Sequence, residues 1–245
     1  MERYEEIERS IVTTYRHRIW ANFIRAIKEY DLIKENDKIA VCISGGKDSM
    51  LMAKCFQQLH KYTNTPFDVV YVVMNPGYKD EDLQRIKDSA SLLNIPITIF
   101  NTDIYKIAYQ DEKNGCYLCA RMRRGALYRF AASQGCNKIA LGHHYDDVIE
   151  TILMNMLNSG SIQTMMPKLH SDNYENMETI RPMYYVREKD IILWAKRFDL
   201  QFIKCACPKL SNCSIDDGST SQRQFTKNLI TELKKTIPLV EKNIF

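Results

Sequence analysis

Hydrophobic and polar positions along this chain follow two alternating periods, which is typical of a protein built from strands and helices in turn. Short apolar runs rich in β-branched residues, with turn residues beside them, predict buried strands. Longer segments with apolar positions three or four residues apart predict amphipathic helices. We expect strands at about 38–43, 67–74, 96–100 and 138–141, with further extended segments near Met183 and at 201–203. We expect helices at about 3–30, 50–61, 80–93, 119–134, 147–157 and 187–198.

Strands separated by helices of this length predict an α/β fold with a doubly wound parallel sheet. In such a sheet the carboxyl ends of the strands meet at one edge, and ligands bind there. This rule brings together the loops that follow the first, second and fourth predicted strands, at 44–49, 75–78 and 142–147. We therefore look for the chemistry of the protein in these loops.

The loop after the first predicted strand carries the most distinctive motif, Ser44-Gly45-Gly46-Lys47-Asp48-Ser49. A Gly-Gly turn between a strand and a helix presents unpaired N–H groups at the positive end of the helix dipole, which favours phosphate. Lys47 adds a positive charge, and the serines add hydroxyl donors. The spacing of a Walker A loop is absent. The alternative is a plain strand–turn–helix connection without a ligand.

Composition sets modest limits on the function. The chain has 245 residues, of which 45% are hydrophobic and 26% charged, which suits one large domain with terminal additions. A formal net charge of +4 permits an anionic partner without requiring one. We find no apolar run of membrane-spanning length and no apolar signal region at the N-terminus, so we expect a cytoplasmic protein. Its eight cysteines then favour metal or sulfur chemistry over structural disulfides.

Cys116 and Cys119 form a C-x-x-C pair, and Cys205, Cys207 and Cys213 follow downstream. Such a pair can hold zinc or an iron–sulfur cluster, or form a redox disulfide. A thioredoxin-like site normally follows the first strand of its fold, whereas this pair lies between the third and fourth strands, which disfavours the redox interpretation. Zinc with four ligands and a cluster with three cysteines and one open iron both remain possible on the residues alone.

The C-x-x-C pair opens an ordered series of motifs. These are ARMRRGALYR at 120–129, KIALGHHYDDVIET at 138–151, MPKL at 166–169, IRPM at 180–183 and VREKDI at 186–191. Together with SGGKDS at 44–49, the series resembles the tRNA 2-thiocytidine synthetase family of PP-loop ATP-pyrophosphatases. The resemblance extends from about residue 15 to about residue 230.

The resemblance implies an adenine nucleotide alpha hydrolase-like fold of the HUP type, and an enzyme that thiolates tRNA. ATP adenylates the C2 carbonyl oxygen of a cytidine at position 32 in the anticodon loop, and sulfur then displaces AMP to give 2-thiocytidine. We expect an N-terminal helical segment at 1–30, a PP-loop ATP-pyrophosphatase domain at 31–204 and a cysteine-containing helical extension at 205–245. The implied partners are tRNA, a sulfur donor such as a cysteine desulfurase, and a second copy of the chain in a homodimer.

The resemblance also implies the site residues. The ATP-binding set is Ser44, Gly45, Gly46, Lys47, Asp48, Ser49, Gly142 and His143. The catalytic set is Asp48, Asp146, Asp147 and Arg123, and the carboxylates of Asp48 and Asp147 are candidates for Mg²⁺. The three cysteines of a [4Fe-4S] cluster map to Cys116, Cys119 and Cys205, with Cys207 as an alternative third ligand. The chain departs from the family here, because a second C-x-x-C followed by Gly-Ser-Gln is missing.

Arginines after the cysteine pair are candidates for tRNA phosphate contacts, namely Arg121, Arg124 and Arg129. A second candidate surface is the N-terminal helix, with Arg9, Arg16, Arg18, Arg25 and Lys28. The arginines after the cysteine pair could equally form a solvated helix face.

Other interpretations of the motifs stay open. Asp147 and Glu150 fit a helix capping box, and His143 fits a half-buried structural imidazole. A related PP-loop enzyme could thiolate another tRNA base or a small acceptor. A non-catalytic nucleotide or redox sensor is a further alternative, although such a sensor has no need of the adenylation residues.

Overall fold

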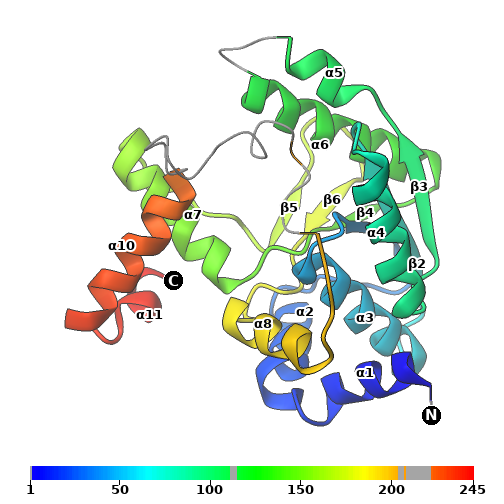
Figure 1. The fold of residues 1–245 in the computed structure, drawn as a ribbon, viewed down its shortest axis with the longest axis horizontal. Coiled ribbons are helices and arrows are strands. Elements are labelled where there is room, and N and C mark those ends of the chain that lie inside the picture. The colour runs from blue at the N-terminus through cyan, green and yellow to red at the C-terminus, as the bar shows by residue number, and fades with distance from the viewer. Residues whose placement is uncertain (1, 111–114, 204–206, 208–221) are drawn as a thin grey trace.

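The computed structural model describes residues 2–110, 115–203, 207 and 222–245 (Figure 1). A six-stranded sheet with the strand order β3-β2-β1-β4-β6-β5 forms its centre. The parallel strands are β1 (Lys38–Ile43), β2 (Asp68–Asn75), β3 (Ile97–Asn101), β4 (Lys138–Ala140) and β6 (Glu178–Ile180). Only β5 (Lys168–His170), at one edge, runs antiparallel to its neighbour. The predicted α/β fold with a doubly wound, mostly parallel sheet is confirmed.

The order of the strands determines where a ligand can bind. The chain runs outward from β1 through β2 to β3 and then crosses back to β4 on the other side of β1. Val41 of β1 lies in register with Ala140 of β4, so these two strands end side by side. A doubly wound sheet binds its ligand at such a reversal, outside the carboxyl ends of the strands. The loops after β1 and β4 therefore share one place.

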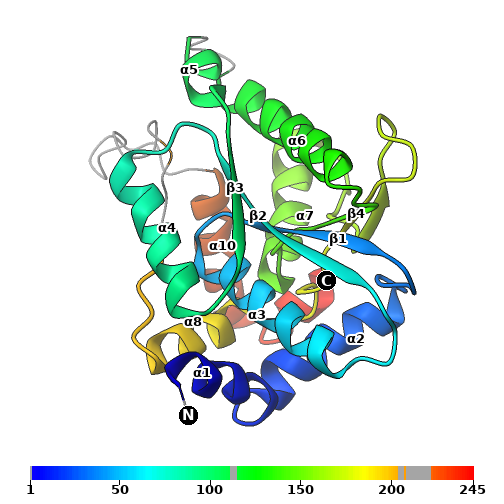
Figure 2. The same cartoon turned by 90° about the vertical axis from the view of Figure 1, so that its right-hand side faces the viewer.

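Helices cover both faces of the sheet (Figure 2). The helices are α1 (Arg3–Val12), α2 (Ala21–Glu29), α3 (Lys47–Tyr62), α4 (Asp80–Leu92), α5 (Ile104–Ala108), α6 (Gly115–Ser133), α7 (Tyr145–Ser159), α8 (Glu188–Arg197), α10 (Gln222–Thr236) and α11 (Val240–Ile244). Successive residues of β1 point to opposite faces. Ile39 and Val41 join the main core with α1–α4 and α8, whereas Ala40 and Cys42 pack against α6.

Several elements differ from the sequence prediction. The helix expected at 3–30 is divided by η1 (Arg16–Trp20), a π-helical turn in which the Tyr15 carbonyl accepts from the Trp20 N–H. The short extended segment expected near Met183 corresponds to β6, which ends at Ile180, whereas Met183 itself lies in a buried turn and 201–203 forms no strand. Strand β5 and helix α5 were not predicted, because elements of three to five residues are too short to show a period. In the described part of the chain, no helix is long and apolar enough to cross a membrane.

A buried ion pair attaches α1 to α3. The Lys54 ammonium is fully buried and donates to Glu8 at 2.7 Å, to the Gln57 side chain at 2.7 Å and to the Leu93 carbonyl at 3.0 Å. Burial alone raises the pKa of Glu8, but Lys54 and Lys61 outweigh burial and leave the pKa below its ordinary value. The carboxylate is therefore ionised at neutral pH.

We expect Glu8→Gln to lower the free energy of unfolding by about 2–4 kcal/mol, because the Lys54 charge is then buried without its counterion. Urea denaturation at pH 7 measures the change. The matched control is Glu6→Gln on the exposed side of the same helix, for which we expect less than about 0.5 kcal/mol. Equal effects of the two substitutions would contradict the prediction.

Candidate active site

The loop after β1 forms the first turn of α3. Gly46 is the N-cap of this helix and has no side chain to accept from the helix N–H groups, which are left for a ligand. The Ser49 hydroxyl accepts from the Ser44 N–H at 3.1 Å and donates to the Gly46 carbonyl at 3.0 Å. These bonds close the loop around its glycines. The loop thus has the form of an anion cradle at a helix N-terminus.

Two glycines allow the cradle to be packed closely. Gly45 has φ +86°, and a Cβ built there would lie 2.5 Å from Ile86 and 2.8 Å from Ile203. A Cβ built on Gly142 would lie 3.2 Å from the Cα and N atoms of Ser49. The loop after β4 therefore lies directly against the start of α3. The structure brings Gly142 to the cradle, as the sequence predicts.

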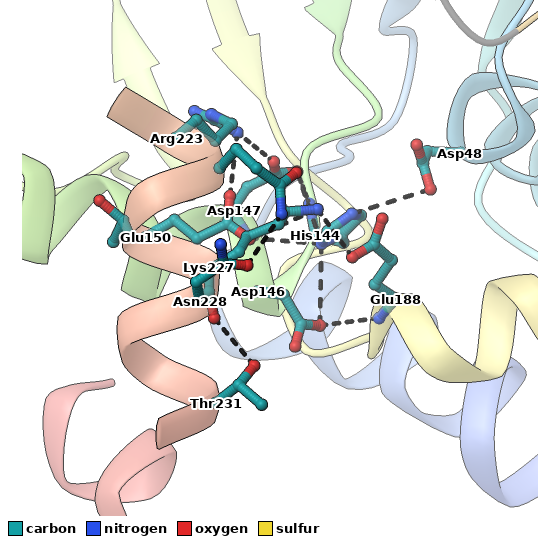
Figure 3. A network of polar contacts seen from close by, with 12 residues as sticks. Asp48, His144, Asp146, Asp147, Glu150, Glu188, Arg223, Lys227, Asn228 and Thr231 are labelled. Carbon is teal, nitrogen blue, oxygen red and sulfur yellow. Dashed lines mark hydrogen bonds and ion pairs between the residues drawn. The ribbon is translucent and has the colours of Figure 1, made fainter. Parts of the chain in front are cut away.

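Helix α7 begins at the same place with a capping box formed by His144 and Asp147. His144 Nδ1 accepts from the Asp147 N–H at 3.3 Å, and Asp147 Oδ2 accepts from the His144 N–H at 3.0 Å. The alternative that paired Asp147 with Glu150 is wrong, because the helix begins two residues before Asp147. The His144 Nε2 atom lies 3.7 Å from Asp48 Oδ1 (Figure 3). His144 thus links the carboxylates of the two loops.

Asp48 and Asp147 have the chemistry of a divalent-cation site. Asp48 Oδ1 is buried and accepts no hydrogen bond from the described residues, although the Lys47 ammonium lies 3.1 Å from it as an ion-pair partner. Burial raises the pKa of Asp147, but His144 and Arg223 outweigh burial, and the pKa lies below its ordinary value. Mg²⁺ prefers ionised carboxylate oxygens together with phosphate oxygens. The two residues therefore fit a Mg²⁺ ion brought with a nucleotide.

Lys47 is held by carboxylates on two sides. Its ammonium lies 3.1 Å from Asp48 and 3.0 Å from Glu188, at the start of α8. The other oxygen of Glu188 pairs with Lys227 of α10 at 3.0 Å. Burial raises the pKa of Glu188, but the two lysines outweigh burial and lower the pKa to about 2. Glu188 thus connects the cradle to the C-terminal helix.

Helix α10 contributes a second cation. Arg223 Nη1 lies 2.5 Å from Asp147 Oδ1 and 3.4 Å from Glu150 Oε2. Helix α10 lies beside α7 in Figure 1, and Figure 3 shows Arg223 and Lys227 on the side that faces the two loops. Arg223 was not predicted as a site residue. Neither Lys227 nor Glu188 was predicted, because their partners are distant along the chain.

Asp146 and His143 lie beside the cradle in supporting positions. Asp146 accepts from the Glu188 N–H at 2.7 Å and pairs with Arg187 at 3.0 Å, so both of its oxygens hold the start of α8. His143 Nδ1 accepts from Arg181 Nε at 3.3 Å. Burial, with help from Arg181 and Arg223, lowers the pKa of His143 to about 4. His143 is therefore a neutral imidazole whose Nδ1 is occupied.

The cysteine pair opens helix α6. Cys116 is exposed and Cys119 is buried. Cys207 lies near Cys119, because both thiols are hydrogen-bonded to the Tyr109 hydroxyl, which is 2.9 Å from the Cys207 sulfur. Burial raises the pKa of Cys119, the Cys207 and Cys116 thiols raise it further, and Arg123 opposes them. Arg123 thus lies close enough to the cysteines for its charge to act on them.

The donor set is one of thiols, which suits zinc or an iron–sulfur cluster. Cys205, the first choice for third ligand, lies outside the described residues, and so does Cys213. Within the described ranges, no three His, Cys, Asp or Glu side chains form a ready metal site. Of Cys205, Cys207 and Cys213, Cys207 is the one that the structure describes.

Comparisons with known proteins agree with this geometry. A family model described as a PP-loop domain matches residues 16–231. The tRNA-cytidine(32) 2-sulfurtransferases of Pelobacter propionicus and Polaromonas naphthalenivorans are 34% and 39% identical to this chain. Each alignment covers 90% of this chain, with 80% and 69% of the respective relative.

A solved structure has the same fold. It is the U34-tRNA thiolase NcsA from Methanococcus maripaludis with its [4Fe-4S] cluster, which superposes with a TM-score of 0.70. The match covers 91% of this chain and 75% of that chain at 24% identity. At this identity the likeness concerns the fold.

We expect Gly45→Ala to destabilise the protein and to abolish stabilisation by pyrophosphate, because the new Cβ meets Ile86 and Ile203. The matched control is Gly135→Ala, where φ is +70° and nothing lies within 4 Å of the added atom. Both variants carry the backbone strain of about 1–2 kcal/mol, but only Gly45→Ala adds about 1–3 kcal/mol of overpacking. Thermal unfolding with and without pyrophosphate measures both effects. A pyrophosphate response retained by Gly45→Ala would refute the cradle.

We expect Glu150→Gln to stabilise the protein at pH 8 more than at pH 5.5. Burial raises the pKa of Glu150 to about 7, and Lys227 and Arg223 only partly oppose it. The folded state therefore takes up a proton as the pH falls through about 7, whereas the unfolded state does so near 4.5. Wild-type stability thus decreases as the pH rises from about 4.5 to about 7 and is level above that, so between pH 5.5 and pH 8 the loss is on the order of 2 kcal/mol.

Melting temperatures at the two pH values test this prediction, with the exposed Glu232→Gln on α10 as the control. If the melting temperature of Glu150→Gln differs from that of wild type by the same amount at both pH values, then Glu150 is ionised at both and the prediction fails.

Proposed function

Because the chain belongs to the PP-loop family and, within it, to the tRNA-cytidine(32) 2-sulfurtransferases, we propose that it replaces the C2 oxygen of an anticodon-loop cytidine with sulfur at the expense of ATP. The observation that carries the proposal is the meeting of the cradle, the carboxylates of Asp48 and Asp147 and two cations of α10 at the reversal between β1 and β4.

The first half of the reaction is adenylation. The C2 carbonyl oxygen of cytidine attacks the α-phosphorus of ATP, an O–P bond forms, and the bond to pyrophosphate breaks. The N–H groups of Gly46 and the first turn of α3 hold the leaving phosphates, and Lys47 exchanges its carboxylate partners for phosphate oxygens. Asp48 and Asp147 would hold Mg²⁺, which neutralises phosphate charge when it is bound.

The residues beside the cradle have supporting roles in this proposal. Arg223, held at Asp147, adds positive charge where pyrophosphate forms. Asp146 positions α8 and therefore Glu188. His143 keeps its Nε2 proton because Nδ1 accepts from Arg181, and so it donates to the nucleotide or the base.

The second half is sulfur transfer. Sulfide attacks C2, the bond between C2 and the activated oxygen breaks, and AMP leaves with that oxygen. Cys116 and Cys119, with Cys205 or Cys207 as the third ligand, would hold a [4Fe-4S] cluster, which supplies iron with affinity for sulfide when it is bound. Arg123, close to Cys119, adds positive charge near the incoming anion. We place the reaction in the cytoplasm, with the enzyme as a homodimer and with sulfur from a donor such as a cysteine desulfurase, whose persulfide a thiol reductant cleaves to sulfide with formation of a disulfide.

The test uses the full chain, reconstituted with iron and sulfide under anaerobic conditions and then supplied with ATP, Mg²⁺, excess sulfide and an unmodified tRNA transcript. We expect 2-thiocytidine in the digested tRNA, and one AMP and one pyrophosphate for each thiolated nucleotide. Lys47→Met should lower both AMP formation and thiolation by at least about 100-fold, because the leaving phosphates lose their main charge partner. Cys116→Ser should retain ATP binding and lose thiolation.

The products separate the alternatives. A thiouridine in place of 2-thiocytidine would move the proposal to another tRNA base. AMP formation without any thiolated base would point to a small acceptor. Neither AMP nor a thiolated base from a reconstituted protein that binds ATP would favour a sensor and refute the enzyme.

A further inference from the structure

One row of side chains on α6 runs from the sheet out beyond its edge. The row consists of Tyr117, Arg121, Arg124, Tyr128 and Ala131, which are four, three, four and three residues apart. This spacing places them on one face of the helix. Tyr128 and Ala131 are buried in the core cluster that contains Ala40 and Ile139 of the sheet. Tyr117, Arg121 and Arg124 are exposed, so the outer half of the same face is not packed against the sheet.

The exposed half of the row lies on the side of the active site. Helix α6 leads into β4, so its first residues lie toward the carboxyl edge of the sheet (Figure 2). Burial lowers the pKa of Arg181, which directly follows β6, and the nearby charge of Arg124 lowers it further. Arg181 in turn holds His143 beside the cradle. The row therefore leads from solvent to the active site.

The chemistry of the row fits a single-stranded nucleic acid. Tyr117 is 71% exposed, which leaves the face of its ring open to a base. Neither Arg121 nor Arg124 has a carboxylate partner among the described residues. A solvated helix face normally mixes acidic and basic residues, but α6 contains no acidic residue. An aromatic ring one helical turn from one cation and two turns from another is suited to stacking a base while the adjoining phosphates are bound.

The cysteines occupy a different side of the helix. Arg123 lies close to Cys119 and Tyr105, and both residues belong to a separate core cluster with Met74. Arg129 also lies off the row, about 120° around the helix from Tyr117. The first half of α6 therefore presents a sulfur-ligand side and a cationic aromatic side next to each other.

We propose that Tyr117, Arg121 and Arg124 form a docking surface for the single-stranded loop of the RNA substrate. A loop base next to the target stacks on Tyr117, and the adjoining phosphates bind Arg121 and Arg124. This inference rests on the proposed function, since it names the surface by which that substrate is held. The target base is thereby brought between the cradle and the cysteines.

The first test measures binding of a fluorescent anticodon stem–loop RNA to the full chain by anisotropy, with an RNA duplex of equal length as the comparison. We expect Tyr117→Ala to raise Kd for the stem–loop about 5- to 150-fold, the range that loss of one stacked base produces. Tyr117→Phe keeps the ring and should stay within about twofold of wild type. Tyr62→Ala is the matched control, because Tyr62 is 74% exposed at the far end of α3.

The second test concerns the two cations. Arg121→Gln and Arg124→Gln should each weaken binding and reduce the slope of log Kd against log salt by about 0.7, as expected for one lost phosphate contact on a single strand. Arg129→Gln removes an exposed arginine from the same helix but off the row, and should leave the slope unchanged. Thermal stabilisation by ATP, measured on every variant, establishes that the fold and the cradle are intact.

The outcomes separate this inference from the function on which it rests. Equal weakening by Arg121→Gln and Arg129→Gln would mean unspecific attraction and would overturn the inference. Unchanged stem–loop binding by Tyr117→Ala would also overturn it, while 2-thiocytidine formation by wild type would leave the proposed function standing. A wild-type protein that binds neither RNA and thiolates no tRNA would refute both.

Discussion

The site depends on one close contact, in which the backbone at Gly142 packs against the first turn of α3. The Cα and N atoms of Ser49 lie where a side chain at Gly142 would be, at 3.2 Å from its Cβ. Because β1 and β4 are neighbours in the sheet, the loops that follow them are forced into the same volume. Only a residue without a side chain lets both loops keep their positions. The cradle and the carboxylates of α7 owe their proximity to this packing.

The second constraint is electrostatic. Lys47, Lys227 and Arg223 meet the carboxylates of Asp147 and Glu188 in a half-buried position, with Asp48 and Glu150 beside them. Charges withdrawn from water need partners of the opposite sign, so these side chains hold one another in place. Phosphate oxygens carry the same charge as the carboxylates that hold Lys47. A nucleotide can therefore take over those contacts without leaving a cation unpaired.

Helix α6 joins the two chemistries that the proposed reaction needs. Its first turn carries Cys116 and Cys119, and its later turns are fixed to the sheet through Tyr128 and Ala131. Because the helix is rigid and the sheet also positions the cradle, the distance between the sulfur side and the ATP side is set by the fold. The exposed face between them is the place where a substrate large enough to reach both must lie.

The local sequence determined the strand–helix order, the anion cradle and the cysteine pair, because each of these arises within a few consecutive residues. The glycines at 45, 46 and 142 and the sequence 116–119 could be interpreted without any partner in space. The ordered series of motifs along the chain, by its resemblance to known proteins, also indicated the family. Elements of three to five residues, such as β5 and α5, were not predicted because they are too short to show a repeated period.

Tertiary structure alone decided which charges meet. The capping partner of Asp147 is His144, and the ion pairs of Arg223 and Glu188 join residues 76 and 141 positions apart. Nothing in a local pattern specifies such pairs, because they depend on where α8 and α10 dock. The exposed row on α6 is also invisible to periodicity, since its spacing continues unchanged from the buried half. Only the end of the sheet determines where that face turns from core to surface.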